Sequence, residues 1–103
     1  MECLFCKITA GEIPSKQEYS DDTCIVFHDI NPQARVHLLI VSRKHIPTII
    51  DLEEGDEQIV GHMIKTAKEI ASKIGLEGYK LKFNVGKKGG QEIFHIHLHL
   101  LAN

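Results

Sequence analysis

The sequence predicts an α+β fold in which one long helix packs across an antiparallel sheet. Two observations lead to this prediction: β-rich segments flank a single long amphipathic helix, and their order along the chain is β-β-α-β-β. The chain has 103 residues, which is enough for one compact domain over 1–103 and too few for two. We therefore expect one domain with a mixed layer architecture.

The first half of the chain predicts a short helical turn and two strands. Residues 3–9 have the composition of a helical turn, and the Gly and Pro that follow would end it. Residues 23–29 are rich in β-formers, and Asn31-Pro32 marks a turn before a second strand at about 35–42.

The second half predicts the long helix and two more strands. Residues 56–74 carry apolar side chains at helical spacing, and Gly75 is a natural stop. The stripe consists of Ile59, Val60, Met63, Ile64, Ala67, Ile70, Ala71 and Ile74. Strands are expected over 79–85 and 93–101, joined by the Gly-rich segment 86–92.

Composition and charge exclude several classes of protein. Apolar residues make up 43% and charged residues 25%, as in ordinary globular domains. The net charge is −2 without a basic block, so neither nucleic acid nor an anionic membrane is an expected partner. No apolar run reaches the ~20 residues of a membrane span, and the N-terminal residues do not resemble a secretory signal. We expect a cytoplasmic protein.

The last predicted strand alternates between histidine and apolar residues. Side chains alternate faces in a strand, so Phe94, Ile96, Leu98 and Leu100 are expected to face the core. His95, His97 and His99 would then share the opposite face. A solvated face normally carries Lys, Glu and Thr, whereas imidazole is the usual base, nucleophile and ligand near neutral pH. A functional row of histidines is the better interpretation.

The three histidines are not expected to bind one metal together. A rise of 3.2–3.4 Å per residue separates the Cα atoms of His95 and His99 by about 13 Å, too far for a shared ion. Cys3-Leu4-Phe5-Cys6 has the C-x-x-C spacing of a zinc site, and His45 and His95 are candidates to complete it. A redox pair or two idle cysteines are the alternatives, although no βαβ pattern follows the motif.

His97 and His99 remain for chemistry, together with His37 on the strand at 35–42. A neutral imidazole attacks phosphorus well, and a second imidazole can protonate the leaving group. The loop 86–90 is Gly-rich, so its backbone N–H groups can approach phosphoryl oxygens closely, although a simple turn is the alternative. This combination favours phosphoryl or nucleotidyl transfer through histidine.

The motif His95-Ile96-His97-Leu98-His99-Leu100-Leu101 resembles the signature of the histidine-triad nucleotide hydrolases and transferases, His-φ-His-φ-His-φ-φ with φ apolar. The segments 27–34, 37–41 and 44–46, with Asn84 and Gly89-Gly90-Gln91, resemble the Hint branch in order and spacing. This resemblance implies a five-stranded antiparallel sheet with one long and one short helix. It also implies a homodimer with a ten-stranded sheet.

The resemblance also implies residue roles. His97 would attack the α-phosphorus and carry the nucleotidyl group, with His99 and His37 binding phosphate and helping proton transfer. Asp29 would accept from the ribose hydroxyls, Asn84 would reach the phosphate or ribose, and Gly90 belongs to the phosphate loop. Phe5, Ile8, Phe27 and Ile30 would line the base pocket. Cys3, Cys6, His45 and His95 match the zinc ligands of zinc-bearing members. Cys24 is interpreted as a packing residue.

One residue departs from the animal pattern of this family. Glu92 occupies a position where animal members carry a serine near the phosphate, and a carboxylate there would repel phosphate or assist a leaving amine. The leading hypothesis is hydrolysis of nucleoside 5′-phosphoramidates, purine preferred, with a structural zinc and no organic cofactor. The alternatives are a dinucleoside polyphosphate hydrolase, a zinc-stabilised nucleotide-binding module with little catalysis, and a catalytic metal on His97 and His99.

Overall fold

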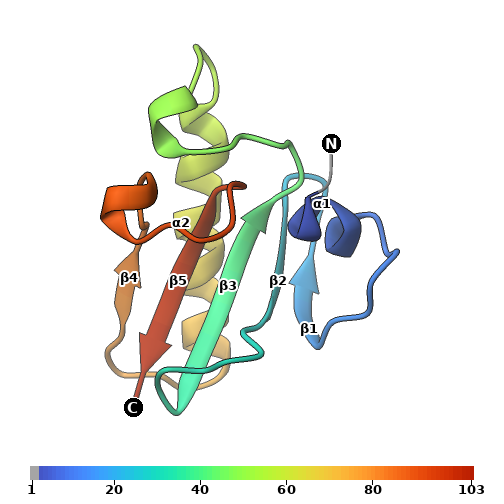
Figure 1. Ribbon diagram of the computed structural model, residues 1–103. Coiled ribbons are helices and arrows are strands. Elements are labelled where there is room, and N and C mark those ends of the chain that lie inside the picture. The colour runs from blue at the N-terminus through green and yellow to red at the C-terminus, as the bar shows by residue number, and fades with distance from the viewer. Residues whose placement is uncertain (1–2) are drawn as a thin grey trace.

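The computed structural model describes residues 3–103, and the predicted domain therefore extends two residues beyond the described part at its N-terminal side. Five strands form one antiparallel sheet in the order β1-β2-β3-β5-β4 (Figure 1). The strands are β1 (Gln17–Ser20), β2 (Cys24–His28), β3 (Val36–Ser42), β4 (Lys80–Lys82) and β5 (His97–Ala102). The helices are α1 (Leu4–Thr9) and α2 (Glu57–Lys73), with 3-10 turns η1 (Ile49–Asp51) and η2 (Lys87–Gly89). The predicted α+β class is confirmed.

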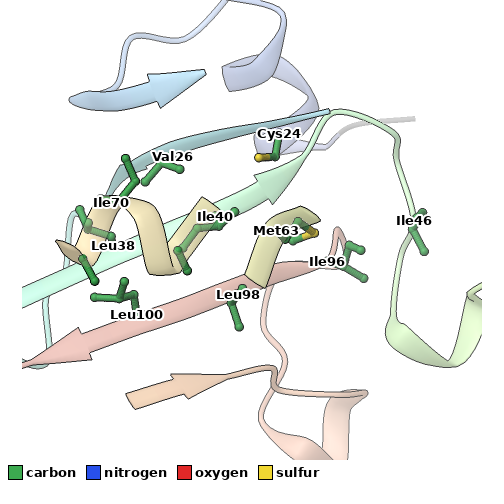
Figure 2. Packing of buried hydrophobic residues seen from close by; sticks show 12 residues of the cluster. Cys24, Val26, Leu38, Ile40, Ile46, Met63, Ile70, Ile96, Leu98 and Leu100 are labelled. Atoms are coloured by element: carbon green, nitrogen blue, oxygen red, sulfur yellow. The ribbon is translucent and has the colours of Figure 1, made fainter. Parts of the chain in front are cut away.

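The helix α2 covers one face of the sheet, behind the strands in Figure 1. Met63 and Ile70 of α2 pack on alternate residues of β3 and β5, including Leu38, Ile40 and Leu98 (Figure 2). Gly75 ends the helix with φ 79°, a conformation that side chains disfavour. Among residues 3–103, no helix is both long and apolar enough to cross a membrane.

The short helix α1 packs against the opposite face of the sheet. Phe5 and Ile8 of α1 are buried against Ile25, Phe27 and Leu39, and Val41 belongs to the same cluster. These strand residues alternate with those that face α2, as period-2 strand geometry requires. The residues on β3 and β5 that share the α1 face include His37, His97 and His99, so the sheet turns its histidines away from the main core.

Several details differ from the sequence-based expectations. The pattern missed β1, because every residue of Gln17–Ser20 is exposed and the strand has no apolar alternation. The last strand begins at His97 rather than at 93, since the chain bends over 93–95. Phe94 consequently leaves the core and is 44% exposed, which contradicts its predicted burial. Ile64 and Ile74 of the predicted stripe are also exposed.

Candidate active site and metal cluster

A cavity of about 730 Å³ lies between α1 and the face of the sheet that carries the histidines. Its apolar wall comes from α1 and β2, where Phe5 and Phe27 meet edge to face with ring centroids 5.6 Å apart. Ile8, Ile30 and Leu39 extend this wall. The concave apolar surface has the size and character of a small-molecule site.

His97 lies at the centre of the site as the first residue of β5. Its Nδ1 lies 2.7 Å from the carbonyl oxygen of His95, so Nδ1 carries the proton and donates it to that oxygen. Burial lowers the pKa of His97, which keeps the ring neutral. The remaining nitrogen, Nε2, therefore holds a free lone pair. Phe5 packs edge to face against this ring at a centroid distance of 4.9 Å.

His37 and His99 form a hydrogen-bonded pair beside His97. The backbone N–H of Gln33 donates to Nδ1 of His37 at 3.1 Å, so the proton of a neutral His37 is on Nε2. This Nε2 lies 2.9 Å from Nδ1 of His99 and donates to it. The proton of His99 is therefore on its own Nε2, which is buried without a hydrogen-bond partner in the described chain.

Electrostatics keep this pair uncharged in the free protein. Burial, followed by the neighbouring His97, His37 and Lys82, lowers the pKa of His99 to about 4. Burial also lowers the pKa of His37, although Asp29 opposes the shift from 3.4 Å. An unpaired donor on His99 in a neutral pair is well suited to an anionic oxygen.

Polar residues complete the cavity at both ends. At the α1 and β2 end, Asp29 follows β2, and one of its carboxylate oxygens accepts from the backbone N–H of Asn31 at 2.8 Å. At the β4 end lie Asn84, Gly90 and Glu92. The Asn84 amide donates to the Gly90 carbonyl at 3.5 Å, and Gly90 has φ 88°. Every nucleotide-binding residue predicted from the sequence therefore lines this one cavity.

A second cluster lies beside α1. Cys3 and Cys6 meet His45 and His95, and the four ligand atoms lie within 4.8 Å of one another. Nδ1 of His95 lies 3.3 Å from Cys3 Sγ and 3.5 Å from Cys6 Sγ, and Nδ1 of His45 lies 3.2 Å from Cys6 Sγ. A tetrahedral zinc ion places such atoms roughly 3.3–3.8 Å apart, given its usual bond lengths. The four residues therefore fit zinc.

The surroundings of the cluster also fit a metal. Nε2 of His95 donates to the Ser42 carbonyl at 2.6 Å, which leaves the lone pair on Nδ1 toward the thiols. The backbone N–H of Cys6 donates to Cys3 Sγ at 3.3 Å and so supports a thiolate there. Burial raises the pKa of the Cys6 thiol to about 11, so a cation is needed to hold it ionised.

The structure brings together the predicted residues in two groups and adds others that the sequence did not reveal. His97 and His99 line the cavity, and His37 hydrogen-bonds to His99 from outside the lining. Cys3, Cys6, His45 and His95 form the cluster. Sequence reasoning missed Leu39, Lys82 and the backbone N–H of Gln33, which became visible only with the strand register. The described residues also bring Asp29, His37 and His99 within metal-binding distance, without His97.

Cys24 lies outside both groups. It is fully buried in the core under α2, where its thiol donates to Thr66 Oγ1 at 3.7 Å. This position agrees with the packing role expected from the sequence. Asp21, Cys24 and His62 also cluster, but each oxygen of Asp21 already accepts hydrogen bonds, from the backbone on one side and from Tyr19 and His62 on the other.

Comparison with known proteins places this architecture in a family. Residues 2–103 match the family model described as scavenger mRNA decapping enzyme C-term binding. The chain is 46% identical over 103 residues to purine nucleoside phosphoramidase of Escherichia coli K12, covering 98% of this chain and 87% of the relative.

Solved structures agree with this comparison. A HIT family hydrolase from Legionella pneumophila superimposes with a TM-score of 0.96 at 48% identity, over 99% of this chain and 93% of the other. A zinc-bound histidine triad family protein from Mycobacterium smegmatis gives a TM-score of 0.88 at 30% identity, over 100% of this chain and 76% of the other. With the fold, the motif and these matches in agreement, the chain belongs to the histidine-triad family of nucleotide hydrolases.

Proposed function

We propose that this chain hydrolyses nucleoside 5′-phosphoramidates, with purines preferred, to a nucleoside monophosphate and a free amine. The observation that carries the proposal is the tautomer of His97. Its Nδ1–H donates to the His95 carbonyl, so the unprotonated Nε2 is available as a neutral nucleophile in the cavity. The activity named for the Escherichia coli relative supports the choice of bond and of base.

The chemistry proceeds in two displacements. Nε2 of His97 attacks the phosphorus, a P–N bond to His97 forms, and the bond to the leaving amine breaks with its electron pair on the amine nitrogen. Water then attacks the phosphorus, the bond to His97 breaks, and the nucleoside monophosphate is released. One difficult displacement is thus replaced by two easier ones.

The His37–His99 pair handles the proton. A bound phosphoryl anion raises the proton affinity of the neighbouring imidazoles, so the pair takes up one proton with the substrate. That proton goes to the leaving nitrogen, and the attacking water returns one to the pair in the second displacement. The buried, unpaired Nε2–H of His99 is placed to hold a phosphoryl oxygen meanwhile.

The other cavity residues position the nucleotide. Phe5, Ile8, Phe27 and Ile30 enclose the base, and Asp29 accepts from the ribose hydroxyls. Asn84 and the backbone at Gly90 bind on the phosphate side, where Glu92 lies beside the leaving group. These assignments place a nucleoside along the apolar wall and its phosphorus above His97.

A zinc ion held by Cys3, Cys6, His45 and His95 would stabilise the fold and would take no direct part in the two displacements. The tetrahedral spacing of the ligand atoms supports the assignment, as does the zinc-bound relative. When bound, the ion supplies a cross-link that fixes α1 to the sheet. The displacements written above require no organic cofactor.

We also propose a homodimer in the cytoplasm. The edge strands β1 and β4 leave backbone hydrogen-bonding groups for a second copy, which would extend five strands to ten. The cysteines at positions 3, 6 and 24 are free thiols, which a reducing compartment preserves. Analytical ultracentrifugation at micromolar concentration should give twice the chain mass.

The test of the activity compares the wild type with His97→Ala and a matched control, His62→Ala. His62 lies on α2 and pairs with Asp21 away from the cavity. Incubation with adenosine 5′-phosphoramidate should give turnover in the wild type and control. We expect His97→Ala to lose roughly 10³-fold or more, since the nucleophile is gone. Mass spectrometry should detect a nucleotidyl adduct on the wild type. Equal turnover by His97→Ala would remove the proposal.

A further inference from the structure

The cavity runs across the sheet in a known direction. Its nucleoside end is built by α1 and β2, His97 and His99 lie on β5, and the next strand in the sheet is β4 (Figure 1). Neighbouring strands lie 4.7–4.9 Å apart, so β2 and β4 are separated by roughly 14 Å. With the phosphorus above His97, the β4 end is the part of the cavity left for the leaving group.

Lys82 is the residue that β4 contributes to this end. It is half-buried and lines the cavity, and it pairs with His99 in the register between β4 and β5. Residues that face each other in an antiparallel pair project on the same side, so the ammonium lies on the histidine face. Its charge reaches that face, because it contributes to lowering the pKa of both His37 and His99.

Nothing within the described residues neutralises this charge. Lys82 takes part in none of the ion pairs seen between described residues, such as those of Lys44 with Asp56 and of His37 with Asp29. A partly buried ammonium beside two imidazoles is electrostatically unfavourable unless an anion joins it. A charged side chain that lines a cavity without a paired counter-charge is typical of a residue that contacts a ligand.

We propose that Lys82 determines specificity by binding an anionic group on the leaving side of the substrate. This inference rests on the proposed function, because it assumes that the transferred phosphoryl lies above His97. The phosphoryl oxygens already have the Nε2–H of His99, whereas Lys82 lies one strand further along. The anion is either the carboxylate of a leaving amino acid or the next phosphate of a phosphoanhydride.

Glu92 provides a charge of opposite sign at the same end. It lines the cavity from the loop before β5 and is exposed to solvent. Lys82 therefore attracts an anionic leaving group while Glu92 opposes it. Neutralising each one separately must change the selectivity in opposite directions, which gives the proposal an internal control.

The experiment uses two adenosine 5′-phosphoramidates, one of alanine and one of alaninamide, which differ by one negative charge on the leaving group. The measured quantity is the ratio of kcat/KM for alanine to kcat/KM for alaninamide. We expect Lys82→Met to lower this ratio roughly tenfold, the size of one partly buried charge pair, and Glu92→Gln to raise it. Lys82→Arg should keep the ratio within a few-fold of the wild type.

The matched control is Lys80→Met. Lys80 lies on the same strand and face two residues away, but it is exposed and outside the cavity lining, so its ratio should equal that of the wild type. Diadenosine tetraphosphate serves as a third substrate. If Lys82→Met loses more kcat/KM on diadenosine tetraphosphate than on the alanine phosphoramidate, phosphate is the preferred anion. If it loses more on the alanine phosphoramidate, carboxylate is preferred.

The outcomes separate this proposal from the proposed function. An unchanged ratio in Lys82→Met, with normal wild-type turnover, overturns the role of Lys82 alone. If the ratio is unchanged because kcat/KM falls equally for the alanine and the alaninamide substrates, Lys82 contacts the transferred phosphoryl instead of the leaving group. Absence of wild-type turnover on every phosphoramidate overturns both proposals. Circular dichroism and zinc content, compared with the wild type, establish that each variant is folded.

Discussion

Disrupting the proposed zinc site should release α1 and so reduce both stability and binding in the proposed purine pocket. The perturbation is Cys6→Ser, which replaces one of four ligands at the N-terminal helix. A helix of six residues is far shorter than the ~12–15 residues needed for stability in isolation. Within the described chain, α1 is held by this cluster and by the burial of Phe5 and Ile8.

The size of the effect follows from these contacts. Phe5 is 3% exposed and Ile8 is 7% exposed, and full burial of such a side chain contributes about 1.5–3 kcal/mol. Detaching α1 would therefore cost roughly 3–6 kcal/mol. For scale, any ligand present at a thousandfold its dissociation constant stabilises the bound form by about 4.1 kcal/mol, which lies within this range. With a urea m-value of about 1.5 kcal/mol/M, the midpoint should fall by roughly 2–4 M.

The assay is urea unfolding followed by circular dichroism, with zinc measured by elemental analysis in the same samples. We expect one zinc per wild-type chain, and Cys6→Ser should unfold at the midpoint of the chelator-treated wild type. Cys24→Ala is the matched control, because it removes a buried thiol that lies outside the cluster. Its stability should still rise with zinc. A wild type that unfolds at the same urea concentration with and without zinc would refute this reasoning.

Three other predictions address the active site, the core and an ion pair. Adenosine 5′-(methyl phosphate) should bind with proton uptake near pH 6.5, because an anionic ligand raises the pKa of His99 from about 4. Calorimetry in buffers of different ionisation enthalpy measures this uptake; His99→Gln should reduce it, and proton release would contradict it. Leu98→Ala should cost about 2–5 kcal/mol of unfolding free energy, since Leu98 is buried under α2. The control Ile64→Ala, on the exposed side of α2, should cost less than about 1 kcal/mol. Asp21→Asn should cost roughly 1–2 kcal/mol at pH 7 through its lost hydrogen bonds. Burial acts to raise the pKa of Asp21, but hydrogen bonds from His62, Cys24, Tyr19 and Thr23 outweigh it and lower the pKa. This stabilisation is complete above the ordinary carboxyl pKa near 4 and is lost as the pH falls below it, so the difference between wild type and variant should shrink in acid.

The parts of the fold that could be predicted are those where burial imposes a pattern. The strand β5 was predicted because Leu98 and Leu100 alternate with histidines, and α2 because its stripe must face a sheet. The edge strand β1 had no such pattern, since an edge strand with both faces wet carries no apolar alternation. The exposure of Phe94 followed from a bend over 93–95, which periodicity does not encode.

The site was predictable in its residue types and not in its proton positions. His37, His97 and His99 can be recognised as candidates from the sequence, and the family resemblance supplied their expected roles. Their tautomers depend on the backbone N–H of Gln33 and the backbone carbonyl of His95. Almost every residue type has these backbone groups, so the sequence does not indicate which tautomer forms. Lys82 became a candidate only through its register with His99, because 17 positions separate the two residues in the chain (99 − 82).

His95 links the two halves of the site through one peptide unit. Its ring directs Nδ1 to the thiols of Cys3 and Cys6, while its backbone carbonyl accepts a hydrogen bond from Nδ1–H of His97. A metal that fixes the His95 ring would therefore also restrain the backbone carbonyl that sets the tautomer of His97, the proposed nucleophile. His95 lies in the bend over 93–95, before the first residue of β5, and its ring contacts Cys3, Phe5 and Cys6 beside α1. We therefore expect His95, the first histidine of the motif, to affect catalysis through His97 without touching substrate, so that zinc loss lowers kcat as well as weakening purine binding.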